Sequence, residues 1–323
     1  MIASDPLIIP IPEGDIDLLA IGETLIDFIS DEAVGSLQYA ATFRRYLGGS
    51  PANIAVYVAK LGRKAALISK IGIGAFGNFL KGELRHYGVI TDYLVMDHRV
   101  HTSVIFVSRT TGTPDFEAFR SGDYQLTPNE ISEDAIAHAR IIHASTFSLS
   151  REPCRSAVSK ALRFAHELGK IVSLDPNYSP KIWPNYEEAK QVLRKLYRYA
   201  SITKPSLDDA QRLFGTGYTP EQYIQMFHDI GPRLVIMTMG KDGVLISQEG
   251  KIVSHVSARP VKVVDATGAG DSFWAGFLVA MLDGNSLERC ALFAREVVEQ
   301  KLVTVGPLPS AIDRHEIYAR LTE

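Results

Sequence analysis

Strand-like and helix-like patterns alternate along most of this chain, and that alternation restricts the fold more than any other feature. Short apolar runs typical of buried strands occur at residues 18–21, 65–71, 141–144, 171–174, 202–204 and 234–238. Helical spacing of apolar residues lies between them, as at residues 153–168, 186–198 and 220–230. Strands that alternate with helices in this way form sheets with helices packed on both faces. We therefore expect an α/β fold with a mostly parallel central sheet.

A glycine-rich turn at residues 265–271 is the strongest chemical signal in the sequence. It reads Asp-Ala-Thr-Gly-Ala-Gly-Asp, and the apolar residues that follow Ser272 recur with helical spacing. The valines in residues 261–264 predict a strand just before it. A strand-to-helix turn presents unpaired N–H groups to an anion, and glycine lets a phosphate approach the backbone closely.

These residues suit phosphoryl transfer. Gly268, Ala269 and Gly270 could hold the charge that builds on a transferring phosphate. Asp271 could take the proton from an attacking hydroxyl. A plain glycine turn in which Asp271 caps a helix explains the same residues. A second motif decides between the two interpretations.

That motif lies far upstream, at residues 47–55, and reads Leu-Gly-Gly-Ser-Pro-Ala-Asn-Ile-Ala. Ser50 is a plausible helix cap, and the proline after it suits the first helical position. Asn53 then falls in the first helical turn and points beyond the helix end. An amide carries both donors and an acceptor, which suits a sugar hydroxyl.

With these two motifs in this order, the chain resembles the PfkB, or ribokinase-like, family of carbohydrate kinases. The resemblance implies a three-layer αβα fold, with a mostly parallel central sheet between helices and a small β-sheet lid over the sugar. It also implies ATP as donor and Mg²⁺ as the accompanying ion. Residues 28–46 and 99–120 break the strand–helix rhythm and alternate like exposed sheet. We expect them to form the lid, inserted in one kinase domain spanning residues 1–323, and a homodimer to form through it.

The resemblance also implies the site residues. The sugar-binding residues would be Asp27, Gly48, Gly49, Asn53 and Arg120. The ATP-binding residues would be Asn177, Lys204, Thr238, Gly240, Gly243, Asp265 and Thr267. Asp271 would be the catalytic base beside Gly268, Ala269 and Gly270, and Asp209 would hold Mg²⁺ through water. Backbone neighbours of Asp265 bind a monovalent cation in several relatives, which makes K⁺ a candidate cofactor.

Two of these residues also have a purely structural interpretation. Asp27 could be an ordinary turn aspartate, and Arg120 could be a solvated surface arginine. Another class of enzyme is indicated by residues 72–77, Gly-Ile-Gly-Ala-Phe-Gly, which spell a dinucleotide-binding turn with Asp92 further along. An NAD-dependent dehydrogenase would leave both motifs above unexplained. We therefore interpret the short pattern as a chance match.

A protein that senses a sugar or nucleotide without turning it over is the other alternative. Gly74, Ser179, Ser206 and Arg295 depart from residues common in the family. Because Asp271 and its glycines are intact, the sequence favours an active enzyme.

Composition excludes several other classes of protein. A net charge of −3 and a pI near 6.3 provide no basic surface for nucleic acid or for an anionic membrane. No apolar run is long enough to span a bilayer, and Pro10, Pro12 and Asp15 interrupt the stretch that a signal peptide would need. Cys154 and Cys290 are too few for a disulfide framework, which predicts reduced thiols in the cytoplasm.

The acceptor is the least constrained part of the prediction. The segments 204–206, Lys-Pro-Ser, and 119–121, Phe-Arg-Ser, favour a fructokinase-like enzyme that phosphorylates a primary hydroxyl of fructose. Kinases of 2-keto-3-deoxygluconate or 5-dehydro-2-deoxygluconate also use an arginine near Arg120, and ribokinases and nucleoside kinases are further alternatives. An acidic sugar would need the planar fork of Arg120, whereas a neutral ketose would not.

Overall fold

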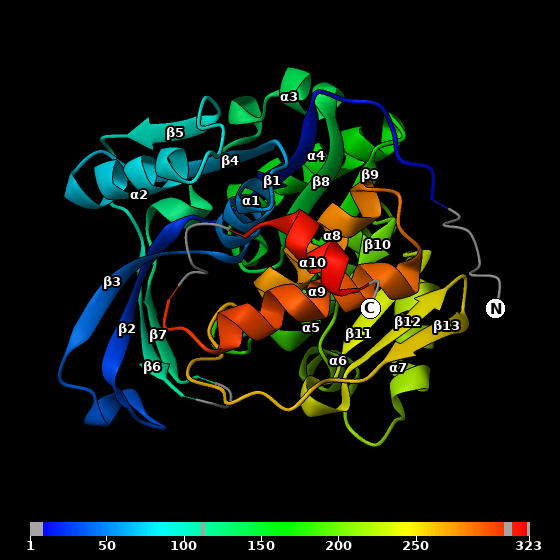
Figure 1. Ribbon diagram of the computed structural model, residues 1–323. Coiled ribbons are helices and arrows are strands. Elements are labelled where there is room, and N and C mark those ends of the chain that lie inside the picture. Colours follow the sequence, from blue (N-terminus) through cyan, green and yellow to red (C-terminus); the bar gives the residue numbers. More distant parts are fainter. Residues whose placement is uncertain (1–8, 111–113, 307–311, 322–323) are drawn as a thin grey trace.

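The computed structural model describes residues 9–110, 114–306 and 312–321. Within them the strands form a nine-stranded sheet, ordered β13-β12-β11-β10-β9-β8-β1-β4-β5, and a separate four-stranded sheet (Figure 1). The large sheet is parallel from β5 to β11, and β12 and β13 add an antiparallel edge. Its strands are β1 (Ile16–Ile21), β4 (Ala65–Gly72), β5 (Leu94–Asp97), β8 (Ala139–Ser145), β9 (Ile171–Asp175), β10 (Ile202–Thr203), β11 (Leu234–Thr238), β12 (Val244–Gln248) and β13 (Lys251–Val256).

Helices cover both faces of this sheet because its strands are apolar on both faces. In β1, Leu18 and Ala20 pack into one apolar cluster, while Leu19 and Ile21 pack into the other. The first cluster receives α1 (Ser50–Lys60), α2 (Ala75–His86), α8 (Ala269–Leu282), α9 (Leu287–Leu302) and α10 (Arg314–Arg320). The second receives α3 (Glu133–His138), α4 (Cys154–Glu167), α5 (Tyr186–Tyr197), α6 (Leu207–Phe214) and α7 (Pro220–Ile230). The expected three-layer αβα fold is confirmed.

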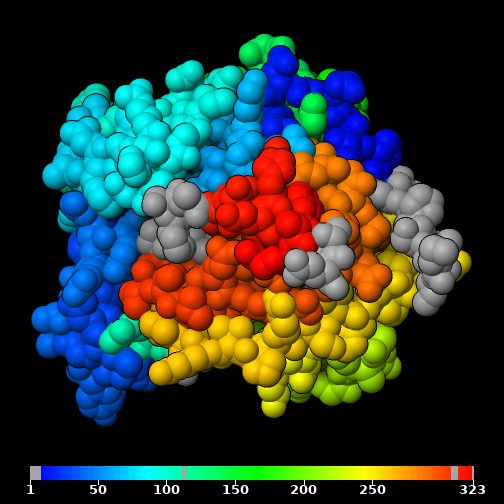
Figure 2. All heavy atoms as spheres, viewed as in Figure 1, coloured from blue at the N-terminus to red at the C-terminus, as the bar shows by residue number. Residues whose placement is uncertain are grey.

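The four-stranded sheet is the expected lid. Its order is β3-β2-β6-β7, and it comprises β2 (Leu25–Ala33), β3 (Phe43–Gly48), β6 (Val104–Arg109) and β7 (Phe116–Phe119). Each predicted segment supplies an antiparallel pair, and β2 joins β6 in parallel across the middle. Figures 1 and 2 show β2 and β3 in blue, projecting at the lower left beside the orange α9. Residues 111–113 of the second segment lie outside the described residues.

Two local expectations differ from the structure. The valines in residues 261–264 form no strand, because β13 already ends the sheet at Val256 and the following chain runs along the end of α9, where the N–H of Val264 donates to the carbonyl oxygen of Leu302. Their alternation instead places Val261 and Val263 in the wall of a cavity. Helix α1 begins at Ser50 and takes Gly49 as its N-cap, one residue earlier than expected.

The turn at residues 72–77 joins β4 to α2 and serves close packing. A Cβ on Gly77 would lie 1.9 Å from the carbonyl oxygen of Gly72, and one on Gly72 would lie 2.4 Å from that of Val100. Only glycine permits such backbone contacts. This turn is not part of the large cavity described below.

None of the helices in the described ranges has the length and apolar content needed to cross a membrane.

Candidate active site

A cavity of about 1080 Å³ lies beyond the carboxyl ends of the central strands and is closed on one side by the lid. Open α/β sheets bind ligands at this edge, where loops and helix N-termini converge. The lid contributes Leu25, Asp27 and Ile105 to the wall, and the starts of α1 and α8 contribute Asn53 and Asp271. The cavity thus unites the two sequence motifs.

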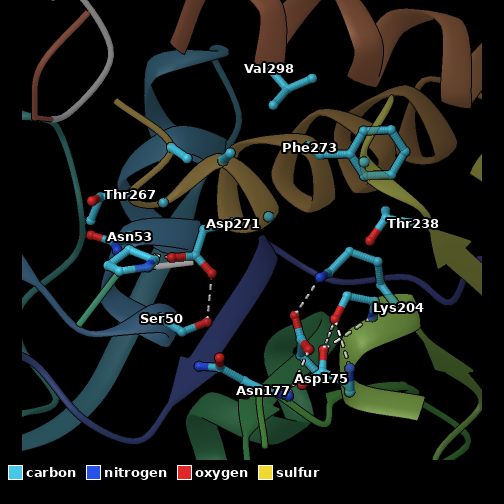
Figure 3. A pocket seen from close by; sticks show the side chains of 18 of the residues that line it. Ser50, Asn53, Asp175, Asn177, Lys204, Thr238, Thr267, Asp271, Phe273 and Val298 are labelled. Carbon is cyan, nitrogen blue, oxygen red and sulfur yellow. Dashed lines mark hydrogen bonds and ion pairs between the residues drawn. The ribbon is translucent and has the colours of Figure 1, made fainter. Parts of the chain in front are cut away.

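Asp271 is held by the upstream motif. Its Oδ1 accepts a hydrogen bond from Ser50 Oγ at 2.7 Å, and its Oδ2 accepts one from Asn53 Nδ2 at 2.9 Å (Figure 3). Burial raises the pKa of Asp271, while these two bonds and the charge of Lys204 oppose the shift. Asp271 caps no helix, because Gly268 is the N-cap of α8. The carboxylate is oriented for chemistry.

The turn before Asp271 has the conformation of an anion cradle. Gly268 adopts φ +74°, a left-handed conformation that favours glycine. A Cβ on Gly270 would lie 3.4 Å from Lys204 Nζ, so the ammonium group stands directly beside the turn. Thr267 Oγ1 is buried and has no hydrogen-bond partner in the described part of the chain. A phosphate oxygen would satisfy it.

Lys204 and Asp175 form a buried ion pair opposite Asp271 (Figure 3), with 3.0 Å between Nζ and Oδ2. Burial by itself would lower the pKa of Lys204, but the carboxylates of Asp175, Asp209 and Asp271 outweigh it and raise the pKa. Burial raises the pKa of Asp175 to about 6 against the pull of Lys204. A fixed positive charge therefore faces the place where a phosphate would lie.

Two acids lie at the lid end of the cavity. Burial, with the charges of Asp271, Asp265 and Glu23 added, raises the pKa of Asp27 to about 7. Burial raises the pKa of Glu23 to about 7 as well; Ser145 donates to its Oε1, and its Oε2 has no partner among the described residues. Such unpaired acceptors suit sugar hydroxyls.

The two glycines of the upstream motif serve this end of the site. A Cβ on Gly48 would lie 2.2 Å from Asp27 Oδ2, so Gly48 makes room for that carboxylate without lining the cavity itself. Gly49, at φ +98°, lies in the wall.

The other end of the cavity is apolar. Thr238, the last residue of β11, lies in its wall with Gly240 and Gly243, which follow the strand. Asn177 lies between the two ends and adopts a left-handed φ of 33°. Phe273 and Val298 also line the cavity and are labelled in Figure 3. Among the aromatic residues of α8, Trp274 and Phe277 are fully buried, whereas Phe273 also reaches the cavity.

Asp209 lies in the cavity wall, but both of its carboxylate oxygens already accept hydrogen bonds from the protein. Oδ1 accepts from the N–H of Tyr178, and Oδ2 accepts from the N–H and the hydroxyl of Ser206, which it caps at the start of α6. No group of three or more His, Cys, Asp or Glu suited to a metal ion occurs in the described ranges. Direct coordination of a metal ion by Asp209 would compete with these hydrogen bonds.

Besides Gly48, two predicted residues lie off the cavity. The guanidinium of Arg120 donates to Asp123 Oδ2 at 2.8 Å, to Ser150 Oγ at 2.6 Å and to the carbonyl oxygen of Phe147 at 3.3 Å. Its side chain is 4% exposed, so it is neither solvated nor a wall residue, and a buried acid rather than a sugar is its partner. Asp265 is fully buried beneath the turn that it anchors, accepting at Oδ1 from the N–H of Thr267.

The sequence did not predict that Ser50 binds Asp271 or that Glu23 lines the cavity. It also gave no indication that Lys301 pairs with Asp265 beneath the glycine turn. Ser50 stands in a recognised motif and carried a signal, although its expected role was a helix cap. Glu23 stands beside Asp27 at the end of a strand, a position from which it could have been found. Lys301 lies in an ordinary helical pattern, and only its burial marks it.

Comparison with known proteins agrees with this geometry. The model of the pfkB family carbohydrate kinases matches residues 15–308. The chain belongs to the PfkB family of carbohydrate kinases. It is therefore a phosphotransferase that acts on a sugar hydroxyl.

Among relatives in the PfkB family, an ATP-dependent 6-phosphofructokinase from Thermoanaerobacterium thermosaccharolyticum is 34% identical over 292 residues, covering 90% of this chain and 89% of its own. Fructokinase-2 from Solanum habrochaites is 34% identical over 273 residues, covering 84% and 83%. A Halothermothrix orenii fructokinase structure has a TM-score of 0.77 at 38% identity and covers 90% and 99%. A Vibrio cholerae O395 fructokinase double mutant, in its fructose-, ADP- and potassium-bound form, has a TM-score of 0.84 at 25% identity and covers 95% and 99%.

Proposed function

We propose that this PfkB kinase transfers the γ-phosphate of ATP to a primary hydroxyl of a neutral ketose, with fructose as the preferred acceptor. The observation that carries the proposal is the lid end of the cavity, where the carboxyl groups of Asp27 and Glu23 line the wall and Oε2 of Glu23 has no hydrogen-bond partner among the described residues. Lys181, a cation of the same wall, is already paired with Asp115 at 2.6 Å. Two carboxyl groups suit the hydroxyls of a neutral sugar, whereas a carboxylate or phosphate on the acceptor would need a free cation in their place.

The same electrostatics rank the alternatives. 2-Keto-3-deoxygluconate, 5-dehydro-2-deoxygluconate and fructose 6-phosphate are all anionic, and Arg120, the expected partner of an acidic sugar, is committed to Asp123. Fructose 6-phosphate is nevertheless the strongest rival, because one relative at 34% identity is a 6-phosphofructokinase.

In the proposed reaction Asp271 accepts the proton of the sugar hydroxyl as its oxygen attacks the γ-phosphate in line. Asn53 and Ser50 hold the carboxylate in position through their hydrogen bonds. The N–H groups of Gly268, Ala269 and Gly270, with Lys204 beside them, stabilise the charge that develops on the phosphate. The lid excludes water from the acceptor.

ATP fits the wall between Lys204 and Thr238, and the orphaned Oγ1 of Thr267 supports a phosphate at the turn. Mg²⁺, when bound, would neutralise charge on the phosphates, held by them and by water rather than directly by Asp209. We place the enzyme in the cytoplasm, which the two buried free thiols support.

We also propose a homodimer through the outer face of the lid. Phe106 contacts Phe28 and Phe43 with ring centroids 5.1 Å apart, and Phe119 at 5.9 Å. These rings lie on the face opposite the cavity, because Ile105 and Val107 alternate with Phe106 and line it. Phe119 is 55% exposed. An exposed aromatic cluster on a sheet is typical of an interface.

An ADP-release assay across acceptors tests the reaction. The panel comprises fructose, ribose, 2-keto-3-deoxygluconate, 5-dehydro-2-deoxygluconate, nucleosides and fructose 6-phosphate. We expect the highest kcat/KM with fructose, and phosphorus NMR of the product should place the phosphate on a primary carbon. A preference for any anionic acceptor would overturn the substrate assignment and leave the kinase assignment standing.

A further inference from the structure

A buried ammonium group lies beneath the glycine turn. Lys301, near the end of α9, is 1% exposed. Its Nζ lies 3.3 Å from each of three oxygens: Asp265 Oδ2, the carbonyl oxygen of Asp265 and the carbonyl oxygen of Thr304. Three donors therefore meet three acceptors, which satisfies the group completely.

Asp265 ties this ammonium group to the catalytic turn. One carboxylate oxygen accepts from the N–H of Thr267 at 3.0 Å, and the other accepts from the N–H of Gly306 at 3.3 Å. Thr267 lies in the cavity wall, three residues before Gly270, so the position of the turn depends on this carboxylate. Within the described residues, the cation that pairs with the Asp265 carboxylate is Lys301. A buried carboxylate without a countercharge would not hold its place.

The oxygen set around Lys301 is one that would also suit an alkali cation. It comprises one carboxylate and two carbonyl oxygens, and carbonyl oxygens are what replace the hydration shell of K⁺ in proteins. An ammonium group has the same single charge and a similar radius. The Vibrio cholerae O395 fructokinase structure, 25% identical to this chain, is a potassium-bound form.

We propose that Lys301 is a tethered monovalent cation, which holds the catalytic turn by its ammonium group and makes the enzyme independent of K⁺. K⁺ does not fit beside it, since the same oxygens would have to serve two positive charges. Burial lowers the pKa of Lys301, and the Asp265 carboxylate opposes that shift. The effect on turnover rests on the proposed function, whereas the cation site itself does not.

The wild-type enzyme provides the first test. Turnover and melting temperature are measured at constant ionic strength in choline chloride, NaCl and KCl, with saturating fructose and ATP. We expect turnover to change by less than about twofold among the three salts. The melting temperature should not shift measurably, because a protein gains stability only from an ion that it binds. A wild-type rate or melting temperature that rises with K⁺ in a saturable manner would overturn the proposal.

The variant Lys301→Met provides the second test. Methionine keeps the apolar stem and removes the charge, which leaves the three oxygens free for a dissociable ion. In choline chloride we expect turnover to fall by about tenfold or more and the melting temperature to drop, because a buried carboxylate has lost its partner. Adding K⁺ should restore both in a saturable manner, and Li⁺, which is smaller, should restore neither.

The matched control is Lys70→Met. Lys70 is another buried lysine, 4% exposed and paired with Asp97 at 3.1 Å and Glu130 at 2.8 Å, away from the cavity. Its loss should lower the melting temperature without selective recovery in K⁺. A Lys301→Met protein that folds but shows no K⁺-dependent melting temperature would contradict the cation site. If no acceptor is phosphorylated by the wild type, the function fails separately, and the melting temperatures still decide the site.

Discussion

Asp271 shows how one residue acquires a role from its neighbours. Its carboxylate is half-buried at the start of a helix, where its pKa is raised, and two donors from a motif far upstream fix both oxygens. A general base must be held within reach of the proton that it removes, with a pKa nearer to the working pH than that of a free carboxylate. Burial and the two hydrogen bonds together meet both conditions.

We predict that Asp271→Asn lowers kcat by about a hundredfold or more, because an amide cannot accept the proton of the attacking hydroxyl. Affinity for sugar and for ATP, measured by calorimetry, should stay within a few-fold of the wild type. The exposed acid variant Asp92→Asn should match the wild type in every respect. Normal turnover in Asp271→Asn would show that the proton leaves by another route.

Asp27 makes stability depend on pH in a direction opposite to that of a salt-bridged acid. Its pKa is about 7 in the folded protein and 3.8 for the reference carboxyl, so the folded state binds the proton more tightly. The stability that this group contributes is therefore complete below the lower value and is lost as the pH rises through about 7.

The corresponding prediction compares Asp27→Asn with the wild type in urea denaturation. The free energy of unfolding of the variant should gain on that of the wild type by an amount on the order of 1–2 kcal/mol between about pH 5 and pH 8, because the amide does not ionise. Asp92→Asn should show no such trend. A difference that stays flat across this range would contradict the raised pKa.

At the scale of elements, strand pairing in the lid places the Asp27 carboxylate against a glycine of the neighbouring strand. Gly48, at the end of β3, pairs with Leu25 in the register that brings it beside Asp27 on β2. The backbone of Gly48 needs no left-handed conformation, so an added methyl group acts on the Asp27 carboxylate rather than on the chain itself.

Gly48→Ala should therefore displace Asp27 and raise the KM for the sugar by about tenfold, with little change in the KM for ATP. Gly35→Ala is the matched control, since Gly35 lies in the same lid and a Cβ there meets nothing within 4 Å. Steady-state kinetics with each substrate varied in turn would check this. An equal rise in both KM values would mean that the lid carboxylate does not act on the sugar alone.

At the scale of the whole molecule, the lid has two faces, one toward the cavity and an aromatic one on which we propose that a second copy packs. The aromatic outer face is partly exposed in the single chain, where Phe119 is 55% exposed. We predict a dimer by analytical ultracentrifugation, and a monomer for Phe119→Glu, because a charge at that exposed ring opposes burial in an apolar interface. Tyr218→Glu, at a ring 46% exposed and far along the chain from the lid, should remain dimeric. A monomeric wild type would refute the lid interface.

The sequence by itself determined the layers, the lid segments and the two motifs of the site. All three are signalled by local patterns: apolar runs buried on both faces, strict alternation in residues 28–46 and 99–120, and glycines next to helix starts. These signals survive folding because the backbone period decides which face a side chain takes. The central strands and the lid followed from them, whereas the resemblance to the PfkB family implied that Asn53 and Asp271 belong to one site.

Only the tertiary structure decided which partner each polar group meets. Arg120 pairs with buried Asp123, and the carboxylate of Asp209 accepts hydrogen bonds from Ser206 and Tyr178. Valines of the segment 261–264 line a cavity instead of joining a sheet. Lys301 is the clearest case, because nothing in its helical pattern indicates that its ammonium group meets Asp265. Such pairings depend on distances between segments remote in sequence, and burial makes them matter, since a buried charge must find its partner within the fold.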